Sequence, residues 1–209
     1  MKTLQTTIRA VLSLSVSALL FVPGCLAPQP GDDGEDVTED IEGEGADEEN
    51  IGEAESELVA WCDPTVSWSS AWASFEDEVI DLMNEKRAAG ATCKGVVKPP
   101  VPPLVKDKRL RCAARRHSKD MSTNNFHSHT GSDGSTHVQR ISKSGYPGSP
   151  GGENIAGGQT TPAKVMASWM ASAHCNGIMN GQHTRVGVGY SHKATASYKH
   201  YWTVDFGRP

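Results

Sequence analysis

The chain has 209 residues, of which 25 are Asp or Glu and 20 are Lys or Arg, so its formal net charge is −5. The charge is unevenly distributed, because residues 31–58 hold fourteen acidic side chains and no Lys or Arg, whereas residues 60–209 have a balance of +7. An acidic segment with few apolar residues cannot form a core, so we expect one folded domain, residues 61–209. Its basic residues are scattered without interleaved aromatic residues, which argues against a nucleic acid partner.

Residues 1–24 are typical of an export signal peptide. Lys2 and Arg9 are followed by an apolar run that ends at Val22 and is too short to span a bilayer comfortably. Residues 22–25, Val-Pro-Gly-Cys, resemble the processing site of bacterial lipoproteins, in which the cysteine becomes the mature N-terminus and carries acyl chains such as palmitate. We therefore expect a lipoprotein anchored in a membrane through Cys25, at the outer membrane or cell surface. The alternative is an ordinary cleaved signal and a freely secreted protein.

Residues 25–60 are expected to form a disordered tether between this anchor and the domain. Repulsion between acidic side chains extends such a segment, which at about 3.3 Å per residue reaches up to about 100 Å. The alternative is that the acidic side chains bind a basic partner or cations.

Helical spacing and capping residues predict two long helices at the start of the domain. Ser74 and Asp77 form a start similar to a capping box, and Phe75, Val79, Leu82 and Met83 continue the apolar face as far as Gly90. The proline-rich residues 98–104 predict an extended connector. Asp107 then predicts the cap of a second helix, whose apolar stripe is Leu110, Ala113, Ala114, His117 and Met121.

The rest of the domain changes from helical to strand periodicity. A short helix is expected from Ser135 through Val138 and Ile141 to Gly145, and another from Thr161-Pro162. Residues 185–190 and 201–206 alternate as strands, and residues 153–156 are the best candidate for a third. These elements predict an α+β domain in which helices cover a small sheet.

Four cysteines remain when Cys25 is assigned to the anchor, which is the number needed for two disulfides in an exported chain. Three pairings can form, and we favour Cys93–Cys112 and Cys62–Cys175. The first would join the end of the first helix to the start of the second, and the other would hold the entering chain to the domain. A four-cysteine metal site is the competing interpretation, but no C-x-x-C pair occurs.

Three residues form the candidate site because of the short segments in which they stand. They are His129 in Ser-His-Thr, Glu153 in Gly-Gly-Glu-Asn-Ile-Ala and His174 in Ser-Ala-His-Cys. Two imidazoles and one carboxylate are a ligand set for zinc or another divalent cation, and equally suit a proton-relaying or hydrogen-bonding cleft. His117 is expected to point inward as a wall of that cleft or a core residue. The other histidines are expected at the surface: His127, His137, His183, His192 and His200.

Six ordered segments carry a family resemblance that covers roughly residues 75–207. They are residues 110–121 (LRCAARRHSKDM), 126–130 (FHSHT), 152–156 (GENIA), 168–174 (SWMASAH), 186–190 (VGVGY) and 201–207 (YWTVDFG). Together they resemble the CAP superfamily, that is, the SCP domain of cysteine-rich secretory proteins, antigen 5 and pathogenesis-related 1 proteins, in its bacterial form.

The resemblance implies an α-β-α sandwich with a three-stranded antiparallel sheet and a cleft where two histidines and two glutamates meet, at which some members bind a divalent metal. By this likeness His129 and His174 are the cleft histidines and Glu153 is the first glutamate. The second glutamate is missing, because the residues after Trp169 read Met-Ala-Ser-Ala. Residues 175–178 also depart from the bacterial pattern, in which asparagine usually comes one position later.

The resemblance and the absence of generic catalytic motifs favour a non-enzymatic extracellular binding module. The sequence contains neither H-E-x-x-H nor G-x-S-x-G, and every cysteine has a covalent role, so no residue is assigned a catalytic role. The ligand is expected to be a lipid, a glycan, a protein or a divalent metal. The alternative is a metal-dependent or His/Glu hydrolase acting on peptide or cell-wall substrates.

Overall fold

The structure is a computed structural model that describes residues 60–209, so the signal peptide, the lipidation site at Cys25 and most of the tether lie outside the described residues. The elements in chain order are η1 (Asp63–Thr65), α2 (Ser70–Ala89), β1 (Ala91–Cys93), β2 (Val96–Lys98), β3 (Val105–Lys106), α3 (Lys108–Asn124), α4 (His137–Lys143), β4 (Ser149–Gly157), α5 (Pro162–Met170), α6 (Cys175–Ile178), β5 (Arg185–His192) and β6 (His200–Arg208).

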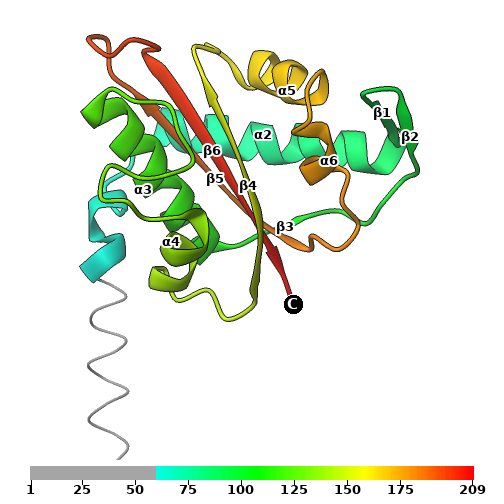
Figure 1. Cartoon of the computed structure of the whole chain (residues 1–209), viewed down its shortest axis with the longest axis horizontal. Coiled ribbons are helices and arrows are strands. Elements are labelled where there is room, and N and C mark those ends of the chain that lie inside the picture. The colour runs from blue at the N-terminus through cyan, green and yellow to red at the C-terminus, as the bar shows by residue number, and fades with distance from the viewer. Residues whose placement is uncertain (1–59) are drawn as a thin grey trace, which may run out of the picture. The chain divides into compact units, whose positions relative to one another are not determined.

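A small central sheet with the strand order β3-β5-β6-β4 organises these elements (Figure 1). The strands β4, β6 and β5 are antiparallel, which confirms the predicted fold class. A two-residue strand, β3, adds a parallel edge beside β5 that the sequence did not reveal. The short hairpin β1–β2 is likewise additional and lies apart from this sheet.

The pleat of the strands gives the sheet two different faces. Trp202, Val204 and Phe206 point to a large core that includes Val79 of α2 and Val165 of α5. The intervening residues of β6 point to the opposite face, which α3 and α4 cover. Figure 1 shows α3 and α4 together on the left, and α5 and α6 on the right. This alternation decides which residues of β4 and β6 can meet the helix α3.

Two glycines of β5 let α3 lie directly on the sheet. A Cβ atom at Gly187 or Gly189 would collide with the backbone of α3, so only glycine permits this approach. Ser118 of α3 uses the proximity to donate a hydrogen bond to the Gly189 carbonyl at 2.9 Å. The predicted stripe of α3 is fully confirmed, because all five of its residues are buried and the Asp107 side chain caps the helix.

Two helix starts differ from the prediction. The first helix begins at Ser70 rather than Ser74, since Trp72 and Phe75 pack against the core and extend the helix toward its N-terminus. The third predicted helix begins at His137, where Thr136 rather than Ser135 forms the cap with Gln139.

The two disulfides form, but the favoured pairing was wrong. Cys62 is bonded to Cys112 with a Cα–Cα distance of 5.7 Å, and Cys93 to Cys175 with 5.5 Å. The prediction assumed that the end of the first helix lies beside the start of the second. Instead, the β1–β2 hairpin places Cys93 near α6, far from α3 in Figure 1. Cys112 therefore faces the chain that enters the domain.

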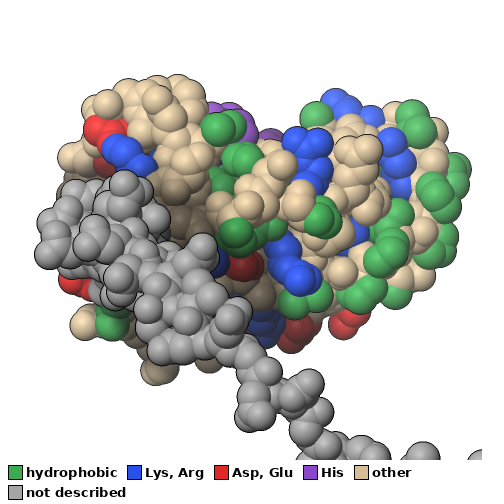
Figure 2. All heavy atoms as spheres, turned by 90° about the horizontal axis from the view of Figure 1, so that it is seen from below, with side chains coloured by type: hydrophobic (Ala, Val, Ile, Leu, Met, Phe, Trp, Pro, Cys, Tyr) green, Lys and Arg blue, Asp and Glu red, His purple; other side chains and the backbone are tan. Residues whose placement is uncertain are grey.

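The surface of residues 60–209 carries scattered charge. Figure 2 shows Lys and Arg side chains dispersed among hydrophobic and uncharged ones on one face, rather than in one continuous stripe. Lys106 of β3 and Arg111 of α3 both form ion pairs with Asp77, whose carboxylate partly offsets their positive charge. Within the part of the chain that the structure describes, no helix is long and apolar enough to cross a membrane.

Candidate functional site: a histidine, carboxylate and arginine cluster

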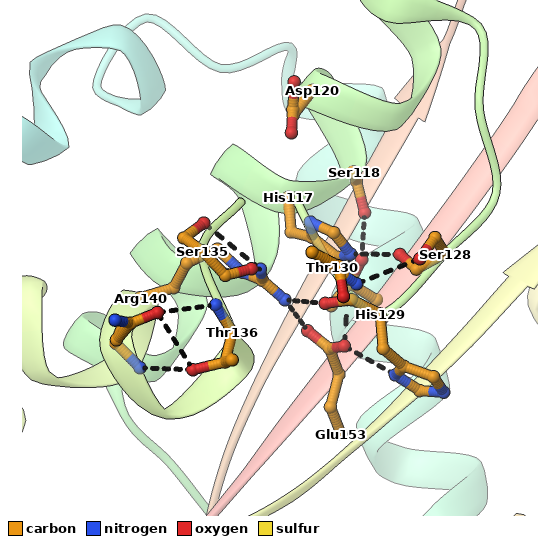
Figure 3. Close-up of polar contacts among 12 residues, drawn as sticks. His117, Ser118, Asp120, Ser128, His129, Thr130, Ser135, Thr136, Arg140 and Glu153 are labelled. Carbon is orange, nitrogen blue, oxygen red and sulfur yellow. Dashed lines mark hydrogen bonds and ion pairs between the residues drawn. The ribbon is translucent and has the colours of Figure 1, made fainter. Parts of the chain in front are cut away.

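Glu153 is the centre of the candidate site (Figure 3). Its place in β4 directs the side chain to the sheet face covered by α3 and α4, where only 1% of it is exposed. Oε1 accepts a hydrogen bond from His129 Nδ1 at 2.7 Å, and Oε2 accepts one from Arg140 Nη2 at 2.6 Å. Burial by itself raises the pKa of Glu153, but the hydrogen bonds from His129 and Arg140 and the charge of Arg140 lower it overall. Glu153 is therefore an ionised carboxylate with both oxygens engaged.

Arg140 is a site residue that the sequence analysis missed. It comes from α4, which the Thr136–Gln139 capping box holds in place. Besides Glu153, it donates hydrogen bonds to the carbonyl oxygens of Ser135 at 2.8 Å and His129 at 3.0 Å. The only sequence signal was its position beside Ile141 on the buried side of a short helix. Arg140 thus supplies the permanent positive charge next to Glu153 and fixes the backbone of His129.

His117 reaches the cluster from the buried stripe of α3, as predicted. Its Nε2 lies 2.8 Å from the Ser128 carbonyl oxygen and 3.9 Å from Glu153 Oε1. A carbonyl oxygen can only accept, so Nε2 carries the hydrogen and Nδ1 keeps its lone pair. Burial lowers the pKa of His117 and outweighs the opposing effect of Glu153, so the ring is neutral near pH 7.

The Nδ1 atoms of His129 and His174 each lie next to one polar side chain. The side chain of His129 is 53% exposed, and because Nδ1 donates to Glu153, its Nε2 lone pair is not engaged by that bond. Nδ1 of His174 lies 2.8 Å from Ser172 Oγ, which also lies 3.0 Å from the Trp169 carbonyl oxygen. Burial lowers the pKa of His174.

The residues fit a three-ligand metal centre poorly. Within residues 60–209, no three His, Cys, Asp or Glu side chains are arranged to hold a metal ion. Glu153, one of the predicted ligands, uses both oxygens for His129 and Arg140. Glu153 acts as a carboxylate that orients the His129 imidazole through its Nδ1–H.

Asp205 is the second residue that sequence analysis missed. It lies directly opposite Glu153 in the β4–β6 pairing and is fully buried. Neither of its carboxyl oxygens has a hydrogen-bond partner among the described residues. Burial, and then the negative charge of Glu153, raise the pKa of Asp205 well above its usual range. Burial therefore favours the protonated, neutral form of Asp205 beside the ionised Glu153. An aspartate within a strand of mostly buried residues was the only hint in the sequence.

Asp205→Asn is expected to make the folded protein more stable at pH 7, because asparagine is neutral in both the folded and the unfolded chain, whereas Asp205 takes up a proton when it is buried. A raised pKa means that the folded chain keeps a proton that the unfolded chain releases. The contribution of Asp205 to the free energy of unfolding therefore falls as the pH rises above about 4, until Asp205 itself ionises. Urea denaturation of the natural chain and of Asp205→Asn, at several pH values above about 4, measures the difference in the free energy of unfolding. An equal gain in the exposed control Asp81→Asn, or a gain that shrinks with rising pH, would contradict this assignment.

The remaining histidines divide between surface and core. His127 and His192 are exposed, as predicted, and His137 and His200 are partly buried. His183 is 3% exposed, which corrects the prediction of a surface position. It stacks on Phe206 with ring centroids 4.7 Å apart and contacts the carbonyl oxygens of Gly151 and Gly177. The reason is the turn between α6 and β5, which folds back onto the sheet.

The fold and the cluster define an α-β-α domain whose buried glutamate orients a surface histidine. Residues 80–206 match the sequence model of the cysteine-rich secretory protein family, CAP. Because the match covers more than half of the chain, this protein belongs to that family, and the resemblance drawn from the six segments is confirmed.

Two Bacillus subtilis (strain 168) proteins are similar in sequence. "Uncharacterized protein YkwD" is 32% identical over 143 residues, which are 68% of this chain and 50% of that protein. "Uncharacterized membrane protein YlbC" is 26% identical over 140 residues, or 66% of this chain and 36% of that protein. This chain therefore spans half or less of these relatives.

A solved structure of an extracellular protein containing a SCP domain, from Bacillus anthracis str. Ames, is also similar. It has a TM-score of 0.55 at 27% identity, covering 66% of this chain and 41% of that one. The likeness agrees with the α+β fold described above.

Proposed function

We propose that this chain is a non-enzymatic binding module that acts outside the cell and takes its ligand at the exposed ring edges of His129 and His174. It is held at a membrane by acyl chains on Cys25, with the acidic residues as a spacer. Two disulfides support an oxidising compartment, and the extracellular Bacillus anthracis protein supports export. Replacing Cys25 with Ala is expected to release the chain from the membrane fraction, and retention there would contradict the lipid anchor.

The engagement of Glu153 is the observation that carries the proposal. A general base must reach its substrate and have a pKa near the working pH, but the Glu153 side chain is 1% exposed and its pKa is lowered. Nε2 of His129 can accept a hydrogen bond, and Nε2 of His174 can accept or donate one, which suits a ligand rich in hydroxyl groups, as lipid headgroups and glycans are. A hydrolase is the second candidate, because the same two imidazoles could act on a bound substrate.

Variants at two exposed histidines separate these functions. The full chain, His129→Ala and the control His192→Ala would be incubated with peptidoglycan and with an unfolded protein substrate, with and without zinc. We expect no turnover in any sample. The same proteins would be applied to glycan arrays and lipid vesicles, where His129→Ala is expected to lose retention and His192→Ala to keep it. Turnover that disappears only in His129→Ala would establish the hydrolase instead.

A further inference from the structure

A second site lies on the other side of His117 and Arg140. A cavity of about 380 Å³ is bounded by the entering segment at Trp61 and Thr65, by α3, and by residues 132–143. Its volume is within the range of small-molecule sites, about 300–1,000 Å³. His117 and Arg140 line it, but His129, Glu153 and His174 do not. The two sites therefore share a wall, and the residues that line them are otherwise different.

The shared wall offers two unused polar atoms to the cavity. His117 is 0% exposed and Arg140 is 4% exposed, yet His117 Nδ1 and Arg140 Nε have no hydrogen-bond partner among residues 60–209. In Figure 3, Ser128 and Ser135 lie on opposite sides of His117, and Ser135 is a cavity residue. Since Nε2 of His117 is used for Ser128, its Nδ1 is an acceptor on the cavity side, and Arg140 Nε–H is a donor. Unpaired buried polar atoms are rare, so this pair indicates a missing partner.

The mouth of the cavity favours a negatively charged ligand. Lys119 and Lys143 are exposed lining residues that form no ion pair within the described part of the chain. The carboxylate of Asp120 is occupied by Asn124 and by the backbone and hydroxyl of Ser132. The lining also includes Arg116 and the carboxylate of Asp133, whose pKa is lowered by hydrogen bonds from Ser135 and by the charge of Lys143. The lining therefore holds four Lys or Arg side chains against two Asp side chains, and Lys119 and Lys143 are the exposed cations among them.

Trp61 adds a fixed aromatic wall. The guanidinium of Arg116 lies 4.5 Å from the centre of its ring and donates a hydrogen bond to the Trp61 carbonyl at 2.7 Å. The Cys62–Cys112 disulfide holds the neighbouring residue against α3. A wall held in this way keeps its shape without a ligand, which lowers the cost of binding.

We propose that this cavity binds a hexuronic acid unit of an acidic glycan. The carboxylate of the sugar lies between Lys119 and Lys143. Both atoms are buried in the free chain, so the wall side chains must shift slightly before a ring hydroxyl can donate to His117 Nδ1 and a ring oxygen can accept from Arg140 Nε. The apolar face of the ring lies against Trp61. This site does not depend on the ligand proposed for His129 and His174.

Calorimetric titration of the full chain with D-glucuronic acid, glucose and sodium sulfate tests the proposal. Glucose has the same ring without the carboxylate, and sulfate has charge without the ring. We expect saturable binding of glucuronic acid and at least about tenfold weaker binding of the other two. The double variant Lys119→Ala/Lys143→Ala is expected to weaken glucuronic acid binding by at least about tenfold. The control Lys86→Ala/Lys164→Ala, which changes exposed lysines elsewhere, is expected to bind as the natural chain does.

Three results would overturn the assignment. They are no saturable binding of glucuronic acid, equal binding by the Lys119/Lys143 variant and the natural chain, and sulfate or glucose binding as tightly as glucuronic acid. The His129→Ala variant is expected to bind glucuronic acid normally. Loss of binding in that variant would mean that the sugar occupies the histidine site, and would also contradict the separate cavity.

Discussion

Replacing Arg87 with Ala is expected to lower the free energy of unfolding by about 3–5 kcal/mol. The Arg87 side chain is 0% exposed and lies between α2 and the turn that follows α6. Its guanidinium donates hydrogen bonds to four backbone carbonyls, those of Pro102, Ile178, Asn180 and His183, at distances of 2.5–3.0 Å. Alanine would leave these buried acceptors without partners and would also open a cavity.

The Arg87 guanidinium thus supplies the hydrogen-bond donors that backbone N–H groups would supply in a helix or sheet. The proline-rich connector and the turn before β5 cannot pair with a strand along most of their length, so the arginine satisfies their carbonyls instead. Urea denaturation of Arg87→Ala beside Lys86→Ala, the exposed neighbour on α2, would measure the effect. We expect the control to change stability by no more than about 0.5 kcal/mol. A similar small loss for Arg87→Ala would show that water replaces the guanidinium.

Replacing Arg140 with Gln is expected to cost about 3–5 kcal/mol of unfolding free energy, because it leaves a buried carboxylate without its cation. Glu153 would keep only the bond from His129, which is itself half exposed. The His129 carbonyl would also lose the donor that holds it. We therefore expect the variant to be less stable and the His129 ring to be less firmly oriented.

A double-mutant cycle distinguishes this ion pair from a general packing role for Arg140. If the loss in Arg140→Gln comes from the unpaired Glu153, then Glu153→Gln/Arg140→Gln should be more stable than Arg140→Gln alone. Arg109→Gln, at an exposed position of α3, is the matched control. Additive losses in the double variant would show that the two side chains contribute independently.

Together these expectations give different roles to two buried arginines. Arg87 satisfies carbonyls and has no acidic partner among its hydrogen bonds, so it is structural. Arg140 pairs with the one carboxylate that contacts the surface histidine and also lines the second cavity. Changes at Arg140 are therefore expected to alter both sites, whereas changes at Arg87 should alter only the stability.

Much of the architecture follows from short-range patterns in the sequence. The Asp107 cap, the apolar stripe of α3 and the Thr161-Pro162 start of α5 are properties of neighbouring residues, and each was predicted correctly. Alternation likewise predicted β5 and β6, and the glycine-flanked Glu153 marked β4. The family was evident from six segments because their order and spacing carry more information than any one of them.

Only the tertiary structure determined which distant residues meet. The disulfide pairing depended on a hairpin that carries Cys93 away from α3, and spacing along the chain could not reveal this. Arg140 and Asp205 belong to the site because a helix and a strand, each short and ordinary in sequence, approach Glu153 in space. Local patterns encode the secondary structure, since their contacts are a few residues apart. The charge balance of a buried cluster is the sum of contacts between residues far apart in the chain, so it becomes visible only once the chain has folded.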